Sequence, residues 1–214
     1  MARRLDGEPL PWLTGTTTFL GAPVRVDRGV YVPRFETELV ARRAIQRLPA
    51  EGVAVDLATG SGAVAVALRR AWPSARVVAS DIDVAACRCA AANGVEVYRG
   101  DLGAPLPTEL HGRVDLVVAV LPYVPSAELE FLPRDVRRHE PRRAHDGGPG
   151  GVELLRRAIG WAAVLSRPGA ALVLEVGGDQ DRALEPDLHA AGFAVVGRIV
   201  DDDGDLRGIE AALN

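Results

Sequence analysis

Two apolar segments of the chain each end in a carboxylate, and a loop of small residues follows the first of them. Val53-Ala54-Val55-Asp56 continues into Leu57-Ala58-Thr59-Gly60-Ser61-Gly62, and Val77-Val78-Ala79-Ser80 ends in Asp81. A glycine turn between a strand and a helix lets a ligand approach the backbone, because no Cβ stands in the way. In an open parallel sheet both carboxylates fall at one edge, where a carboxylate can bind ribose hydroxyls. The pattern therefore predicts a site for a cofactor that contains a nucleoside.

The spacing of the glycines narrows the choice of cofactor. No third glycine follows Gly60 and Gly62 at the spacing of a dinucleotide site, and the Gly-Lys-Ser/Thr of a P-loop is absent from the sequence. S-adenosylmethionine (SAM) remains, with S-adenosylhomocysteine as its product. The Thr59–Gly62 backbone would approach the methionine part of SAM, and Asp81 would hold the ribose. Ile82 would cover the adenine, and Asp101 would accept a hydrogen bond from its amino group.

Strands and helices alternate from residue 53 onward. Strands are expected at 53–57, 75–80, 95–98, 114–119, 170–176, 193–200 and 207–213. Helices are expected at 35–48, 62–71, 84–92, 150–165 and 179–191. Short strands at 16–20, 24–27 and 30–32 form a small hairpin region, and 120–149 is a long irregular segment. Alternating strands and helices predict a doubly wound, mostly parallel α/β sheet, with an antiparallel hairpin made by the last two strands.

Composition excludes several classes of function. The 214 residues carry a net charge of −4, which is atypical of a general nucleic-acid binder. No run of 18 apolar residues predicts a membrane span, and no secretory signal opens the chain, so a cytoplasmic protein is expected. Cys87 and Cys89 have no second Cys/His cluster near them, so no metal site is expected.

A series of motifs carries a resemblance to a known family. In chain order they are Glu8-Pro9-Leu10, Leu13-Thr14-Gly15, Phe19-Leu20-Gly21, Pro33-Arg34-Phe35-Glu36-Thr37-Glu38, Asp56 to Gly62, Pro122-Tyr123-Val124-Pro125, His139-Glu140-Pro141-Arg142 and Asp146-Gly147-Gly148. The series spans nearly the whole chain and resembles the HemK/PrmC-type protein-(glutamine-N5) methyltransferases. The resemblance implies a class I SAM-dependent methyltransferase, with a Rossmann-like sheet of seven strands. It implies that residues 1–50, a hairpin and a helix, cover the cofactor and substrate, and that 51–214 is the SAM-binding catalytic domain.

The motifs and the resemblance together give a set of site residues. The residues expected to bind the cofactor are Asp56, Ala58, Thr59, Gly60, Ser61, Gly62, Asp81, Ile82, Asp101, Leu102 and Val120. The candidate catalytic residues are Pro122, Tyr123 and Glu140, and no metal ligand is among them.

The chain departs from the family at the loop after the fourth main strand. The family's Asn-Pro-Pro-Tyr is Val120-Leu121-Pro122-Tyr123 here. The resemblance implies that the asparagine holds the acceptor amide, and valine has neither a donor nor an acceptor. Losing such a contact costs about 2.7–4 kcal/mol, or ~10²–10³ in rate. Relatives also carry an N-terminal helical domain that recognises the release factor, and this chain starts almost at the hairpin. We therefore expect slow or absent glutamine methylation and no release-factor partner.

These departures favour a small-molecule acceptor of the natural-product type, because Val120 and Leu121 make the pocket mouth apolar. Two other enzymes remain open. One is a protein-(glutamine-N5) methyltransferase acting on a release factor or another protein. The other closes a ring, such as a cyclopropane, on a SAM–methylene adduct made by a radical SAM partner enzyme. A fourth hypothesis is a non-catalytic protein that senses SAM or binds a partner.

The segment 120–149 holds the candidates for a general base, namely Glu140, His139, His145 and Asp146. Glu140 is expected to fix the loop through Arg34 or Arg142, and the two histidines are expected to be exposed. An arginine cluster is expected to lie on a solvated helix face, paired with Glu128 and Glu130. Its members are Arg134, Arg137, Arg138, Arg142 and Arg143.

Overall fold

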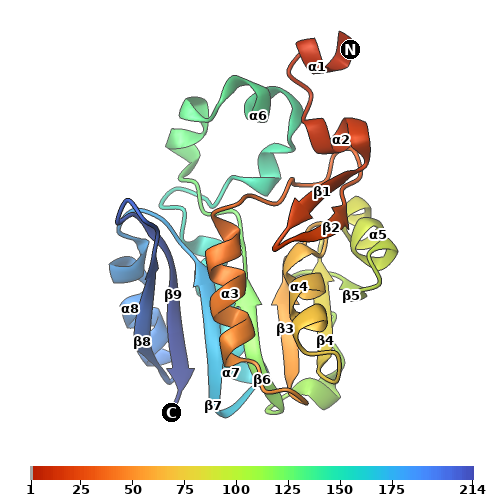
Figure 1. Cartoon of the computed structure of the whole chain (residues 1–214). Helices are drawn as coiled ribbons and strands as arrows, with labels where there is room; N and C mark the ends of the chain where they lie inside the picture. Colours follow the sequence, from red (N-terminus) through yellow and green to blue (C-terminus); the bar gives the residue numbers. More distant parts are fainter. Residues whose placement is uncertain (1) are drawn as a thin grey trace.

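The main sheet has seven strands in the order β5-β4-β3-β6-β7-β9-β8 (Figure 1), seen in a computed structural model that describes residues 2–214. The strands are β3 (Val53–Leu57), β4 (Arg76–Asp81), β5 (Glu96–Arg99), β6 (Val114–Ala119), β7 (Ser166–Glu175), β8 (Phe193–Val200) and β9 (Leu206–Leu213). The first five pair in parallel, and β9 pairs antiparallel with β7 and β8. The doubly wound sheet and the final hairpin are therefore confirmed.

Helices cover both faces of this sheet (Figure 1). One face carries α3 (Thr37–Arg47), α4 (Ala63–Ala71) and α5 (Val84–Ala92), and the other carries α7 (Glu153–Leu165) and α8 (Gln180–Ala190). Alternate strand residues point to opposite faces. Val118 and Val173 pack beneath α3 and α4, whereas Val117 and Leu172 pack against the α7 side. Burial on both faces explains why these strands are continuous apolar runs.

A small N-terminal unit lies beyond the carboxyl ends of the parallel strands, at the top of Figure 1. It consists of α1 (Ala2–Leu5), α2 (Leu10–Thr14), β1 (Thr16–Phe19) and β2 (Ala22–Arg25). Leu20 and Gly21 turn the hairpin with φ of 46° and 72°, as a two-residue turn of the I′ kind requires. The second strand thus begins at Ala22, two residues before its predicted start. The strand predicted at 30–32 is wrong, because Val30 bonds back to Asp27 in a turn.

The segment 120–149 contains short helices, so the prediction that it is irregular was wrong. They are η2 (Ser126–Phe131), α6 (Arg134–His139) and η3 (Arg142–Ala144), and a further short helix, η1 (Thr108–Leu110), precedes β6. Pro125, Pro133 and Pro141 each stand directly before one of the three. A proline lacks the N–H that a first turn leaves unpaired, so it starts such a turn at little cost.

Element boundaries differ from the predictions mostly by one or two residues. The largest differences are at α7, which begins at Glu153 rather than 150, and at β7, which begins at Ser166 rather than 170. The helix starts late because Gly151 is left-handed, with φ of 72°.

The connections leave a crevice at one edge of the sheet. The chain builds β3, β4 and β5 outward in one direction and then returns to place β6 on the other side of β3. Ligands of doubly wound proteins bind at such a reversal, outside the carboxyl ends of the strands. Within residues 2–214, no helix has the length and apolar character needed to cross a membrane.

Candidate functional site

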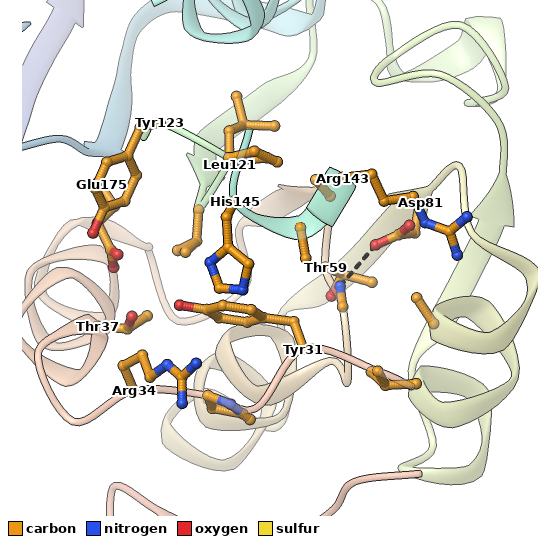
Figure 2. Close-up of a pocket in the computed structure, with 18 of the residues that line it drawn as sticks. Tyr31, Arg34, Thr37, Thr59, Asp81, Leu121, Tyr123, Arg143, His145 and Glu175 are labelled. Carbon is orange, nitrogen blue, oxygen red and sulfur yellow. Dashed lines mark hydrogen bonds between the residues drawn. The ribbon is translucent and has the colours of Figure 1, made fainter. Parts of the chain in front are cut away.

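A cavity of about 790 Å³ lies over the carboxyl ends of β3, β4, β6 and β7. Its walls come from these strand ends, from the 29–37 segment and from the helical segment between β6 and α7. Figure 2 shows Asp81 and Arg143 at one end, and Tyr123, Glu175 and Thr37 at the other. The volume lies within the range of about 300–1,000 Å³ that is typical of small-molecule sites.

The loop after β3 presents bare backbone to this cavity. Gly60 has φ of 57°, and a Cβ added there would meet no protein atom within 4 Å. Ala58 and Leu102 also line the cavity and have positive φ, 58° and 49°, although neither is glycine. Backbone strain of this kind collects at functional sites, where the surrounding structure holds it in place. A Cβ on Gly62 would instead press on Ala90 and Val95, so that glycine serves the packing of α4 on α5.

Two strand-end carboxylates are fixed by hydrogen bonds on the cofactor side. Asp56 Oδ2 accepts from Thr59 Oγ1 at 2.6 Å, and Asp81 accepts from the Gly60 amide at 2.9 Å (dashed in Figure 2). Burial raises the pKa of Asp56 to about 7 and also raises the pKa of Asp81. Both carboxylates can accept hydrogen bonds from a ligand. SAM offers matching donors, namely its ammonium group and its ribose hydroxyls. The bare loop and these carboxylates therefore fit SAM.

The adenine end holds one apolar and one charged residue that the sequence predicted. Ile82 lines the cavity although 63% of its surface is exposed, so it is free to cover a flat ring. Asp101 also lines the cavity, but its carboxylate pairs with Arg157. Because both side chains are about half exposed, the pair is weak enough to open for an amino group. All predicted site residues line the cavity except Gly62 and Glu140.

The other end of the cavity holds residues that were not among the predicted site residues. Tyr31, Thr37 and Glu175 line it together with the predicted Pro122 and Tyr123. Burial raises the pKa of Tyr31, Tyr123 and Glu175. Glu175 carried a usable signal, because it ends the buried apolar strand β7 as Asp81 ends β4.

Glu140 lies behind the cavity wall and holds the segment between β6 and α7 in place. Its two oxygens contact Arg34 Nη2 at 2.6 Å and His145 Nε2 at 3.0 Å. The Tyr31 ring meets His145 edge-on, with 5.5 Å between centroids (Figure 2). The expected contact between Arg34 and Glu140 is thus present. The expectation that His145 is exposed was wrong, since this contact and the ring bury it. His139 contacts the Asp6 carbonyl oxygen.

The arginine cluster pairs with other acids than expected. Within residues 2–214, Glu128 and Glu130 form no ion pair with it. Arg138 pairs with Asp6 at 2.8 Å, Arg142 with Asp146 at 3.0 Å, and Arg143 with Asp83 at 2.6 Å. The expected partners lie on η2, which prolines separate from α6 and η3, so the arginines meet the N-terminal segment and the start of α5 instead.

No group of three or more His, Cys, Asp or Glu lies close enough to hold a metal ion in the part of the chain that the structure describes.

Comparisons with known proteins agree with this geometry. Residues 54–140 match a family model described as a methyltransferase domain. The release factor glutamine methyltransferase of Moorella thermoacetica is 42% identical over 200 residues, which are 89% of this chain and 69% of that protein. The enzyme of the same name from Bradyrhizobium diazoefficiens is 38% identical, over 90% of this chain and 68% of that protein.

Solved structures show the same fold. A release-factor-specific protein-(glutamine-N5) methyltransferase from Alicyclobacillus acidocaldarius has a TM-score of 0.53 at 24% identity, covering 86% of this chain and 94% of that chain. A Thermus thermophilus 16S rRNA methyltransferase in complex with AdoMet and guanosine has a TM-score of 0.61 at 19% identity, covering 92% of this chain and 44% of that chain. SAM is the cofactor, as predicted, and the chain is a SAM-dependent transferase.

The same relatives overturn the expected acceptor and partner. A small-molecule acceptor of the natural-product type, and the statement that a release factor is not the partner, rested on Val120 and on the chain's first residues. Identities of 35–42% over most of the chain, all with release factor glutamine methyltransferases, contradict both. The hypothesis of a ring-closing enzyme with a radical partner enzyme rested on the same departures from the family, so it loses its basis as well. The error was to judge the acceptor end from residues 120 and 121, because Tyr31, Thr37 and Glu175 make that end polar as well.

Proposed function

Because the chain belongs to the family of release factor glutamine methyltransferases, we propose that it transfers the methyl group of SAM to the side-chain amide nitrogen of a protein glutamine. A release factor is the proposed substrate, and the cytoplasm, where such a factor works, is the proposed compartment. The 42% identity over 89% of the chain is the observation that carries this proposal.

The residues proposed to bind SAM follow the strand ends. They are Asp56, Ala58, Thr59, Gly60, Ser61, Asp81, Ile82, Asp101, Leu102 and Val120, with Gly62 shaping the loop from behind. Asp81 is proposed to accept from the ribose hydroxyls, since its oxygens are already oriented by the Gly60 and Asp83 amides. Asp56 is proposed to accept from the ammonium end, either directly or through Thr59.

The acceptor side is proposed to orient the amide. SAM supplies a methyl carbon bound to a positive sulfur, which an aligned nucleophile can displace. Pro122 and Tyr123 line the adjoining wall, and their backbone and ring would hold the glutamine side chain in line with that carbon. Glu140 is proposed as a positioning residue, because it acts on this wall through Arg34 and His145.

We also propose that residues 1–50 cover the site and that 51–214 form the catalytic domain. Support comes from the 29–37 segment, which lines the cavity, and from Arg138 and His139, which contact Asp6 in the N-terminal segment. A cover of this kind excludes water from the reacting groups.

The test is methyl transfer from labelled SAM to a release factor that contains Gly-Gly-Gln. We expect label in that glutamine and none in a factor whose glutamine is replaced by alanine. If the protein binds SAM but leaves the intact factor unlabelled, the proposed function is wrong.

A further inference from the structure

Two carboxylates are buried under α3 on the same face of the sheet, and in the part of the chain that the structure describes only one of them forms ion pairs. Glu210 on β9 pairs with both Arg43 and Arg47 of α3. Glu175, at the end of β7, is 4% exposed, and its Oε2 has no hydrogen-bond partner within residues 2–214. A buried carboxylate oxygen without a hydrogen bond of normal geometry destabilises a fold, so Glu175 needs another reason to be there. It lines the cavity, which Glu210 does not.

A hydroxyl at the same end of the cavity is also unsatisfied. Thr37, the first residue of α3, is buried, and its Oγ1 makes no hydrogen bond of normal geometry within residues 2–214. Figure 2 shows Thr37, Glu175 and the Tyr123 ring together at the end of the cavity opposite Asp81. The two unsatisfied groups are complementary to a carboxamide. Its N–H can donate to Glu175 Oε2, and its carbonyl oxygen can accept from Thr37 Oγ1.

The sheet register places Glu175 next to Val120. The last parallel pair between β6 and β7 joins Ala119 to Leu174, so Val120 and Glu175 follow it on neighbouring strands. Val118 and Val173, two residues earlier on each strand, both face α3 and α4, so strand alternation puts Val120 and Glu175 on that face too. Glu175 therefore stands beside the position that offers no polar group of its own.

We propose that Glu175 and Thr37 hold the acceptor carboxamide and that Glu175 takes up the proton which its nitrogen loses. This proposal rests on the proposed function. As the N–CH₃ bond forms, the C–S bond breaks and its electron pair stays on sulfur. One N–H proton passes to the Glu175 carboxylate, which becomes a carboxylic acid and later releases the proton to solvent. Glu175 thus makes the polar contact with the carboxamide that the Val120 side chain cannot make.

The charges around Glu175 favour a carboxyl group that exchanges a proton. Burial raises its pKa and Glu36 at the start of α3 adds to the rise, whereas the neighbouring hydroxyls of Thr37 and Tyr123 and the cation of Arg207 on β9 oppose it. Tyr123 and Tyr31 complete the titratable surroundings, and burial raises the pKa of both phenols, so they stay protonated. We expect kcat to rise with pH through a pKa above the ordinary glutamate range.

The experiment compares wild type with Glu175→Gln, which keeps the shape but removes the proton acceptor. We measure kcat and KM for the release factor across pH at saturating SAM, the Kd of SAM, and Tm. We expect kcat to fall about 10²-fold or more, the acid limb of its pH profile to disappear, and the Kd of SAM to stay the same. Tm should be unchanged or higher, because a buried charge is gone. Thr37→Val should mainly raise KM.

Two further variants sharpen the result. Glu210→Gln is the matched control, since it removes a buried carboxylate on the same face and should lower Tm while kcat is kept. Val120→Asn should restore more activity in the Glu175→Gln background than it adds to wild type, because the two positions serve one carboxamide.

The outcomes separate the two claims. If wild type labels the factor and Glu175→Gln keeps both kcat and the acid limb, the role of Glu175 is wrong and the proposed function stands. If kcat of Glu175→Gln falls only in proportion to a lowered Tm, as expected for a structural residue, the proposed role of Glu175 is also wrong. If wild type binds SAM but labels no factor, both claims are wrong.

Discussion

Three carboxylates at strand ends have different surroundings, and these decide what each can do. Asp56 has a hydroxyl partner and Asp81 has two backbone amides, whereas Glu175 has an oxygen that no described residue satisfies. The first two are held in fixed orientations suited to a resident cofactor. The third is free to accept a proton from a substrate that comes and goes.

Asp56 makes the stability of the cofactor-free protein depend on pH. Its pKa is about 7 in the fold, raised mainly by burial, against about 3.9 in an unfolded chain. A raised pKa gives stability that is complete below about pH 4 and is lost as pH rises through about 7. For Asp56→Asn we expect this loss to vanish. The free energy of unfolding of wild type, minus that of the variant, should fall by about 4 kcal/mol between pH 4 and 8.

Urea unfolding of both proteins at each pH checks this prediction. The subtraction removes the titration of all other groups that the two proteins share. A difference that stays flat over this range would show that Asp56 is ionised in the fold at acid pH.

At the scale of elements, the segment between β6 and α7 is a wall tied to other parts of the chain. Glu140 joins it to Arg34, Arg138 joins it to Asp6, and Arg143 joins it to Asp83 at the start of α5. Among these, the Glu140 contact is the buried one. It therefore contributes more to holding the wall than the exposed pairs do.

Replacing Glu140 by alanine should open this wall locally. The change leaves Arg34 and His145 without their partner, at a cost of about 1–3 kcal/mol. We expect faster amide exchange over residues 120–149 and weaker binding of S-adenosylhomocysteine, with the sheet still protected. Hydrogen exchange read by mass spectrometry checks this. Glu130→Gln, which changes an exposed side chain on η2, should leave amide exchange over this segment unaltered. If the amides of 120–149 exchange equally slowly in both variants, the role given to Glu140 is wrong.

Elements with strong local patterns were predicted well from the sequence. The boundaries of β3, β6 and α5 match the predicted ranges, because apolar runs bounded by turn residues specify them locally. The helices within 120–149 were missed, since each is three to six residues long and has no hydrophobic period to detect.

At the scale of the whole molecule, cofactor binding should stabilise the fold. S-adenosylhomocysteine at a hundredfold excess over its Kd should add about 2.7 kcal/mol. For a chain of this length that raises Tm by about 5–10 °C. Gly60→Val should abolish the shift, because its Cβ would stand in the cavity and its φ of 57° suits glycine. Thermal unfolding with and without the ligand measures it.

Gly112→Val is the control for backbone strain. Gly112 also has a positive φ, 68°, and open space around it, but it does not line the cavity. Gly112→Val should be less stable than wild type, as Gly60→Val is. S-adenosylhomocysteine should still raise the Tm of Gly112→Val. If S-adenosylhomocysteine raised the Tm of Gly60→Val as much as that of wild type, the ligand would bind outside this cavity.

The sequence by itself determined the sheet, the cofactor and the family, because each motif that indicates them is a short run of neighbouring residues. Apolar runs, a glycine turn and a carboxylate at each strand end sufficed for the cofactor edge. The acceptor end was decided only by the tertiary structure. Thr37, Tyr123 and Glu175 come from three distant segments that meet where β6 and β7 end. Whether a buried oxygen has a hydrogen-bond partner depends on which side chains the fold brings around it. Residues 120 and 121 carry no such information, so the acceptor inferred from them was wrong.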